Sequence, residues 1–508
     1  MSNTQARDLT VPLFTSVEKR NIVFYIAGIM CYKFALESYN GTIKAFALDR
    51  FPESQRYTYN GYLDGFNQAA QCIGSILVAP LVRKFHTRTV LASAIFFFAL
   101  ISSLGMIIEA ATGGKTPGNS PTGKAIAGSW DPRGVIPIFV IAGVAHGMIE
   151  LIRRIIPRDI VGGNVIKLKK MDSLVHIFYE VAGTSGAFFA TFIALQLGKA
   201  FAPVVTPFLY IVAAFLWSRI QVASADDEAP RPIDSVEEGP GIVAQIGGAF
   251  AAFGVAIYEG ARIIFTERRF TWLIFGYSIP LVLHRYLENG LGANYAKLVL
   301  NESAYSSLLV GGSNFGELCG AFFVFVFTHA VKTPLPWLRL DAITLSITWV
   351  LYKITPAALG LNSLQTAWVI AAIFVPVSMG WAAGDVSLAA FIQSHVSRLN
   401  NTNPRVSPLG AVMAFLYVTY IVVYAVINPV IGQWLDRLPK ADKTPYFFYI
   451  GGVMFTCTGV LIFISTFWPK GSWKFNPTLE EDYPEEEDIE EVGGFEKRHD
   501  DMVEQIVG

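Results

Sequence analysis

The chain has 508 residues, of which 53% are hydrophobic and only 16% are charged, and its mean hydropathy is +0.44. A soluble protein carries roughly a quarter charged residues, so this composition excludes an ordinary soluble protein, a disordered chain and a secreted disulfide scaffold. The 39 basic and 40 acidic residues give a formal net charge of -1, which argues against a nucleic-acid-binding protein. We therefore expect an integral membrane protein.

Apolar segments near the length that crosses a bilayer as a helix, about 20 residues, recur along almost the whole chain. Twelve such segments are present, which predicts an all-α protein with twelve transmembrane helices. In chain order, the predicted spans cover residues 22–47, 61–82, 89–110, 135–156, 173–197, 203–223, 270–290, 306–330, 340–355, 366–392, 409–431 and 446–468.

A long middle segment separates the first six spans from the last six. The fold class is therefore all-α and integral to the membrane, with two pseudo-symmetric six-helix bundles. Within the middle segment, residues 241–265 are apolar and rich in Gly and Ala. We interpret them as a helix lying on the membrane surface, with a thirteenth span as the alternative. The expected parts are an N-terminal tail (1–20), a first bundle (21–223), a linker (224–268), a second bundle (269–469) and an acidic disordered tail (470–508).

Basic residues concentrate in the segments on one side of these spans, for example Arg153, Arg154, Lys169 and Lys170. Because loops rich in Lys and Arg stay on the cytosolic side, we expect both termini in the cytosol. The plasma membrane and the vacuolar membrane are both left open. Asn301 begins an Asn-Glu-Ser sequon in a predicted outside loop and is a candidate for N-glycosylation.

The two halves share a short sequence pattern. The second span contains Gly-Phe-Asn-Gln-Ala-Ala-Gln-Cys (65–72) and the eighth contains Gly-Ser-Asn-Phe-Gly-Glu-Leu-Cys (312–319), so Gly, Asn and Cys recur with the same spacing. Transporters are commonly built from such repeats, with the binding site between them near the membrane midplane. Twelve spans in two halves joined by a long loop resemble the major facilitator superfamily. The run Arg-Arg-Ile-Ile-Pro-Arg-Asp-Ile-Val-Gly-Gly (153–163) is similar to a fungal branch of that superfamily with no defining substrate.

The resemblance implies that spans three, six, nine and twelve face lipid, while the others line a central cavity. The charges follow this division, because spans three, six and twelve contain no interior charge and span nine carries Asp341 and Lys353 only at its predicted ends. In the loop between spans two and three, Lys84 and Arg88 match the superfamily's gating motif. The usual Asp and Gly of that motif are replaced here.

Ionisable side chains inside a span cost about 3 kcal/mol or more, so they normally face a cavity or a partner. On the first span, Lys33, Glu37, Asn40 and Lys44 share one helical face, and Lys33 is one turn from Glu37. We interpret this stripe as lining the cavity. The alternative is a structural ion pair near the outer end of the helix.

The seventh span carries a second cluster, in which His284 and Glu288 are four residues apart, as are Arg285 and Asn289. Arg285 is a candidate for binding an anionic substrate group or for neutralising Glu37 or Glu288. The alternative is that this end of the helix is simply close to water.

The polar residues in and next to the spans form three sets of candidates. The candidate substrate contacts are Tyr39, Asn40, Asn67, Gln71, Tyr179, Arg285, Asn289 and Asn314. The candidates for proton coupling or charge pairing are Lys33, Glu37, Lys44, His176, Glu180, His284, Glu288 and Glu317, and the candidates for gating are Lys84, Arg88, Glu150, Arg153, Arg154 and Asp385.

We expect a secondary active transporter that moves a small organic solute by alternating access, with proton coupling through a buried carboxylate such as Glu37 or Glu180. The alternative is a transporter-like membrane sensor or scaffold that signals through the acidic tail. No catalytic or nucleotide-binding motif occurs, so we expect no enzyme activity, no cofactor and no metal site. The expected partners are a small-molecule substrate, protons and the bilayer, with no nucleic acid, and the expected state is a monomer.

Overall fold

A computed structural model of the protein describes residues 14–154, 156–161, 165–221, 241–327, 330–331, 333–396, 407–439 and 442–477. Their regular structure is helical, apart from one isolated bridge between Lys115 and Ile126. The first 13 residues, most of the predicted linker before residue 241, and the acidic tail from residue 478 onward lie outside the described residues.

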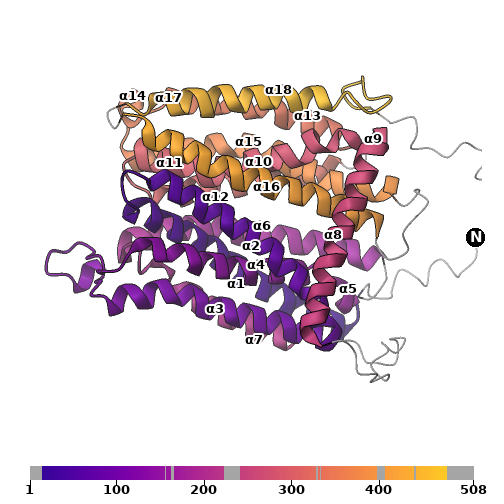
Figure 1. Cartoon of the computed structure of the whole chain (residues 1–508), viewed down its shortest axis with the longest axis horizontal. Coiled ribbons are helices and arrows are strands. Elements are labelled where there is room, and N and C mark those ends of the chain that lie inside the picture. Colours follow the sequence, from indigo (N-terminus) through magenta and orange to yellow (C-terminus); the bar gives the residue numbers. More distant parts are fainter. Residues whose placement is uncertain are drawn as a thin grey trace, which may run out of the picture.

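The first half contains six long helices that run along one common direction, with α5 (Ile156–Val161) as a short helix between two of them (Figure 1). The first begins at a capping box, in which Thr15 and Glu18 satisfy each other's backbone N–H groups. The six helices are α1 (Ser16–Arg50), α2 (Arg56–Lys84), α3 (Thr87–Ala111), α4 (Val135–Ile152), α6 (Val165–Leu197) and α7 (Val205–Ser218).

The second half also contains six membrane crossings. Three of these crossings are not continuous α-helices but are divided into α-helical, 3-10-helical or π-helical segments. The seventh comprises α9 (Arg268–Thr271), η4 (Ile274–Ser278), α10 (Ile279–Tyr286), η5 (Leu287–Leu291) and α11 (Gly292–Leu298), the ninth α13 (Leu335–Thr344) and η6 (Leu345–Tyr352), and the twelfth α17 (Thr444–Tyr446), η7 (Phe447–Met454) and α18 (Phe455–Ser465). The continuous helices are α12 (Tyr305–Phe327), α15 (Ser363–Val396) and α16 (Pro408–Arg437), and α14 (Pro356–Leu359) is a short loop helix.

These elements confirm the predicted all-α fold with twelve crossings. Ten described helices, α8 (Ile242–Thr266) among them, are long and apolar enough to cross a membrane. The sixth crossing is a shorter apolar helix, and the seventh and ninth are interrupted. The predicted limits of the ninth span were wrong at its start, because α13 begins at Leu335 rather than at residue 340.

The two ends of the bundle differ in what they carry. We call the end at which α1 begins and α18 ends the terminal end, which lies on the right in Figure 1. The opposite end, where α1 is connected to α2 and α11 to α12, is the loop end. Both described chain termini therefore lie at the same end of the bundle.

Helix α8 differs from all the crossings in direction, because it runs across the ends of the other helices at the terminal end (Figure 1). It packs on α16 through the contact of Gly260 with Ala411 and the ring contact of Phe265 with Phe415, and it also touches α2. Much of its apolar surface is exposed, including Val243 (80%). The helix thus contacts both halves and leaves an apolar face uncovered.

Each half has its own hydrophobic core, and the halves meet along two helix pairs, α2 with α16 and α6 with α12. Two glycines of α2 allow its backbone to pack closely against that of α16. A Cβ at Gly61 would lie 2.6 Å from the backbone nitrogen of Pro429, and one at Gly65 would lie 3.1 Å from Cα of Ala425. Only hydrogen at these positions lets the two backbones approach so closely.

Candidate functional site

Helices α1, α6 and α12 meet near the middle of the bundle, at Gly183. A Cβ at Gly183 would lie 2.6 Å from Cε of Lys33 and 3.5 Å from Nδ2 of Asn314. Lys33 Nζ lies 2.5 Å from Glu37 Oε1, and both side chains are largely buried. The Lys33 ammonium also lies 4.5 Å from the centre of the Tyr179 ring, a cation–π contact. The first-span stripe thus contacts α6 and α12 at this point.

The seventh crossing brings a second charged pair to the same region from the other half. Arg285 Nη1 lies 3.1 Å from Glu288 Oε2, and Glu288 Oε1 accepts a hydrogen bond of 2.7 Å from Ser313 of α12. The Arg285 side chain is 45% exposed, whereas that of Glu288 is 4% exposed. Arg285 interacts electrostatically with Glu37 and Glu317, so it faces the junction of the two halves. Its exposure therefore indicates water-accessible space between the halves at this depth.

Two more carboxylates, Glu180 and Glu317, lie beside these pairs. Glu180 of α6 is 4% exposed, and its Oε2 is buried without a hydrogen bond. It lies one turn from Gly183 and interacts electrostatically with Lys33 and Arg285. Glu317 of α12 is half-buried and interacts electrostatically with Glu180, Arg285 and Lys33. We refer to Lys33, Glu37, Glu180, Arg285, Glu288 and Glu317 as the central cluster.

Glu150 and Arg153 are tied into the first half. Arg153 Nε donates to Glu150 Oε2 at 2.7 Å, and Glu150 Oε1 accepts from the hydroxyls of Tyr179 (3.1 Å) and Tyr32 (3.2 Å). The Arg153 guanidinium lies 4.2 Å from the centre of the Tyr179 ring. Tyr179 therefore lies between Arg153 and Lys33, and the ion pair expected to gate does not reach the other half.

Arg154 does reach across the halves toward the terminal end. It interacts with Tyr417 of α16 and electrostatically with Asp385 of α15. Asp385 also interacts with Tyr277 of η4 and with His176 of α6, whose Nε2 is buried without a partner. Arg154 and Asp385 are therefore the gating candidates that face each other from different halves.

At the loop end, ion pairs and hydrogen bonds join the two halves. Asp49 of α1 contacts both Lys199 and Lys297, the latter at 2.6 Å, and Lys199 lies 2.6 Å from Glu302. Burial opposes the charge on Lys199, but Asp49 and Glu302 outweigh it and raise the pKa of this loop lysine. The network therefore stays charged at neutral pH.

Lys44 and Asn289 belong to this closure rather than to the central cluster. Lys44 Nζ donates to Asn289 Oδ1 from the other half and lies 3.4 Å from Asp64, which is 4% exposed. Asp64 lies within the predicted second span, so it is an ionisable residue in an apolar segment, like the other buried charges. Sequence reasoning missed it, because a carboxylate near the end of a span also fits a water-exposed position.

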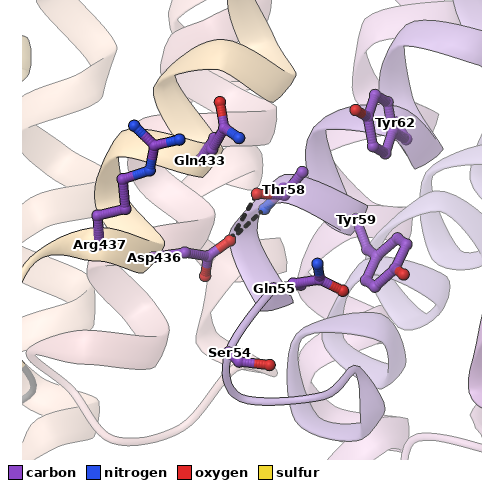
Figure 2. Close-up of a pocket in the computed structure, with 8 residues that line it drawn as sticks. All are labelled: Ser54, Gln55, Thr58, Tyr59, Tyr62, Gln433, Asp436 and Arg437. Atoms are coloured by element: carbon purple, nitrogen blue, oxygen red, sulfur yellow. Dashed lines mark hydrogen bonds between the residues drawn. The ribbon is translucent and has the colours of Figure 1, made fainter.

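A pocket of about 300 Å³ lies between α2 and α16 at the loop end (Figure 2). Asp436 accepts hydrogen bonds from the backbone N–H of Tyr57 (3.1 Å) and of Thr58 (2.9 Å) and from the Thr58 hydroxyl (2.7 Å). It thereby caps the N-terminus of α2 with a carboxylate from the other half, where the helix dipole favours negative charge. The lining residues are Ser54, Gln55, Thr58, Tyr59, Tyr62, Gln433, Asp436 and Arg437.

Three candidate substrate contacts pack inside the first half instead of facing the other half. The Tyr39 ring is fully buried against Phe98 and Phe139. Asn67 donates to the carbonyl oxygen of Phe139 (2.6 Å), and Gln71 donates to Asn67 Oδ1 (2.7 Å). The side-chain amides of Asn67 and Gln71 therefore bond within the first half, whereas the Tyr39 hydroxyl is buried without a hydrogen-bond partner.

The remaining candidates lie apart from the central cluster. Arg88 donates to the carbonyl oxygen of Ile220 (3.0 Å) within the first half, and Lys84 is exposed at the end of α2. Asn40 is half-buried on α1, and Asn301 is exposed between α11 and α12 at the loop end. Among the described residues, no group of His, Cys, Asp and Glu side chains is arranged to hold a metal ion.

The expectation that span nine carries charge only at its ends was wrong for Asp341. Asp341 Oδ1 lies 2.8 Å from His284 Nε2, both side chains are almost fully buried, and the His284 ring stacks on Trp381. Arg339, also fully buried on α13, donates to carbonyl oxygens of residues 466–475. His284 thus lies in the core of the second half, away from the charges of the first half.

We expect Asp341→Ala to cost about 3 kcal/mol of stability, because removing one partner of a buried pair leaves the other without compensation. The measurement is the melting temperature of the purified protein. Asp131→Ala, which breaks an exposed ion pair with Arg133, is the matched control and should leave the melting temperature unchanged. Equal effects of the two substitutions would contradict the structural role of Asp341.

Solved structures of transporters share this architecture. No protein-family model and no curated protein sequence matches the chain. The fold is similar to that of a D-xylose–proton symporter (TM-score 0.59, 14% identity, covering 92% of this chain and 99% of that chain). It is also similar to the nucleoside transporter NupG (0.59, 12%, 90% and 100%) and to a peptide transporter POT in complex with sulfate (0.60, 13%, 91% and 98%). The chain therefore has the twelve-helix fold of major facilitator transporters.

Proposed function

We propose that the protein is a secondary active transporter that moves a small organic solute by alternating access. The observation that carries this proposal is the central cluster, in which buried charges from both halves converge beside water-accessible space at Arg285. Buried charges are costly in a membrane and are retained where they bind a solute or an ion. The two halves would rock around this cluster.

The charges of the central cluster favour a zwitterionic solute. Arg285 has one ion pair through Nη1 and its side chain is 45% exposed, so an anionic group could bind its remaining donors. Glu180, whose Oε2 is buried without a hydrogen bond, and the neighbouring Glu317 suit an ammonium group. Asn314, whose Nδ2 is buried without a partner, lies one turn from Glu317 and adds a donor. An amine and a carboxylate on one small molecule would satisfy all these groups together.

We place both termini in the cytosol, following the positive-inside rule. The loop end then faces outward and is closed by the Asp49 network and by Asp436, while Arg154 meets Tyr417 and Asp385 of the other half toward the cytosolic end. Helix α8, with its exposed apolar face, would lie on the cytosolic membrane surface.

Proton coupling would use Glu37, because its nearest charge is a lysine on the same helix that also contacts α6. Burial favours the protonated carboxylate, and a nearby cation favours the ionised one. A change in the distance between Lys33 and Glu37 during rocking would therefore change the proton affinity of Glu37. That coupling is sufficient for a symporter or an antiporter.

The test is uptake into proteoliposomes under an imposed proton gradient. The probes are radiolabelled amino acids, the amines formed by removing their carboxylate, and the acids formed by removing their amino group. We expect concentrative uptake of at least one zwitterion and none of the matched amine or acid. Glu37→Gln should abolish concentration against a gradient while exchange continues. Failure of every probe to cross or bind would contradict the proposal.

Removing the acidic tail after Pro477 should leave uptake unchanged, because the central cluster does not depend on it. A cut after Lys470 is the informative comparison. It also removes Ser472, Lys474 and Phe475, whose carbonyl oxygens accept from buried Arg339, and it should lower the melting temperature. Loss of uptake on the first truncation would instead favour a tail-dependent sensor.

A further inference from the structure

A second candidate site lies on the outer surface of the first half, away from the central cluster. A groove of about 690 Å³ runs between α3 and α7. The residues that line it are Arg88, Thr89, Ala92, Ser93, Phe96, Ile211, Ala214, Phe215 and Ser218.

The lining changes from polar to apolar along the groove. Arg88 and Ser218 lie where α3 begins and α7 ends, at the terminal end of the bundle. Phe96 lies about 12 Å deeper along α3, at 1.5 Å per residue, and Ile211 lies about 10 Å deeper along α7. Phe96 and Ile211 are each about half exposed. The groove therefore has a polar mouth at one membrane surface and an apolar floor toward the membrane interior.

The mouth of the groove is basic. Arg88 uses one of its five N–H donors on the Ile220 carbonyl oxygen, which fixes the guanidinium at the mouth and leaves the other donors available. Arg219 is exposed beside it, with its guanidinium 5.7 Å from the centre of the Phe215 ring. Lys84 is exposed on the adjoining turn between α2 and α3. Among the described residues, no carboxylate lines the groove.

We infer that this groove binds an anionic phospholipid, with the phosphate at Arg88 and Arg219 and an acyl chain along Phe96 and Ile211. The charge of the mouth is complementary to a phosphate, and the depth of the apolar floor suits an acyl chain. Basic pockets between transmembrane helices at the cytosolic surface bind anionic headgroups in this way. The inference does not rest on transport, because α3 and α7 contribute nothing to the central cluster.

This site also accounts for Lys84 and Arg88, which match a gating motif in sequence but, within the part of the chain that the structure describes, contact only the first half. Arg88 faces lipid, and its hydrogen bond to the carbonyl oxygen of Ile220 joins α3 to the segment just beyond α7. A lipid held there would stabilise the packing of α3 on α7 at the terminal end.

The experiment measures binding of dioleoyl phosphatidylglycerol to the full-length protein in detergent, by native mass spectrometry and by melting temperature. Dioleoyl phosphatidylcholine and glycerol 3-phosphate are the comparison ligands. We expect the anionic lipid to bind and raise the melting temperature, and neither comparison ligand to do so. Binding of glycerol 3-phosphate with equal effect would replace the lipid by a free phosphate and overturn the inference.

The double substitution Arg88→Gln and Arg219→Gln should weaken lipid binding about thirtyfold, because each basic residue near an anionic surface contributes roughly fivefold. Lys115→Gln with Lys124→Gln, which removes two charges from the loop end, is the matched control and should bind as the unsubstituted protein does. Phe96→Gln tests the acyl floor and should weaken binding while the basic mouth is intact. Equal weakening by the control pair, or none by the arginine pair, would overturn the inference.

Discussion

Gly61→Leu should reduce transport about tenfold to a hundredfold and leave the loop end open. A Cβ at position 61 would lie 2.6 Å from the Pro429 nitrogen and 2.8 Å from the Asn428 carbonyl carbon, so any side chain meets backbone of the other half. Overpacking a tight interface typically costs 1–3 kcal/mol. That is enough to remove the closed state from an equilibrium whose two states differ by a few kcal/mol.

Two measurements check this expectation. Uptake gives the loss of turnover, and the distance between spin labels at Ser54 and Gln433, on opposite halves of the loop-end pocket, reports whether the end has opened (Figure 2). Gly105→Leu is the matched control, since a Cβ there meets nothing within 4 Å. A normal label distance with normal uptake in Gly61→Leu would contradict the assignment of α2 and α16 as a closing surface.

Arg285→Gln should weaken binding of a zwitterionic solute about thirtyfold or more. A charge-assisted hydrogen bond contributes roughly 1.5–3 kcal/mol, and the substitution removes the cation while keeping a polar side chain. Arg285→Lys should restore part of the affinity, because it keeps the charge but loses the planar fork. Binding is measured directly, by titration of the purified protein, so that a defect in rocking does not interfere.

Ligands that lack one charge separate the roles of the two ends of the cluster. Arg285→Gln should leave the weak affinity for the matching amine unchanged, and Glu180→Gln should leave that for the matching acid unchanged. Arg133→Gln, at an exposed pair on the loop end, is the control for loss of one positive charge. If both substitutions weakened both partial ligands equally, Arg285 and Glu180 would be maintaining the fold rather than contacting solute.

Part of the central cluster could be predicted from the sequence, because some of its ion pairs join two residues of the same crossing. Lys33 and Glu37 lie one turn apart, so their pairing follows from helical spacing alone. Arg285 and Glu288 likewise belong to one crossing, but their partners on α12 and α1 do not. Sequence spacing gives no information about which face of another helix lies opposite.

The same reason explains the contacts that sequence spacing does not give. Asn67 and Tyr39 are polar residues in apolar helices, which is also the signal of a cavity-lining position, but their neighbours on α3 and α4 enclose them. The contact of Asp341 with His284 joins two crossings far apart in the chain. Its register depends on where α13 begins, and the predicted start was five residues late.

The sequence by itself determined the number of crossings, the two-fold division of the chain and the charged face of the first helix, because each depends on hydrophobic length or on a period within one segment. The tertiary structure decided which charges meet. It brings Glu180 and Glu317 to Arg285, assigns Lys44 and Asn289 to the loop end, and places Arg88 at the groove between α3 and α7. The physical reason is that such contacts depend on the packing and register of helices from distant parts of the chain, which no local pattern encodes.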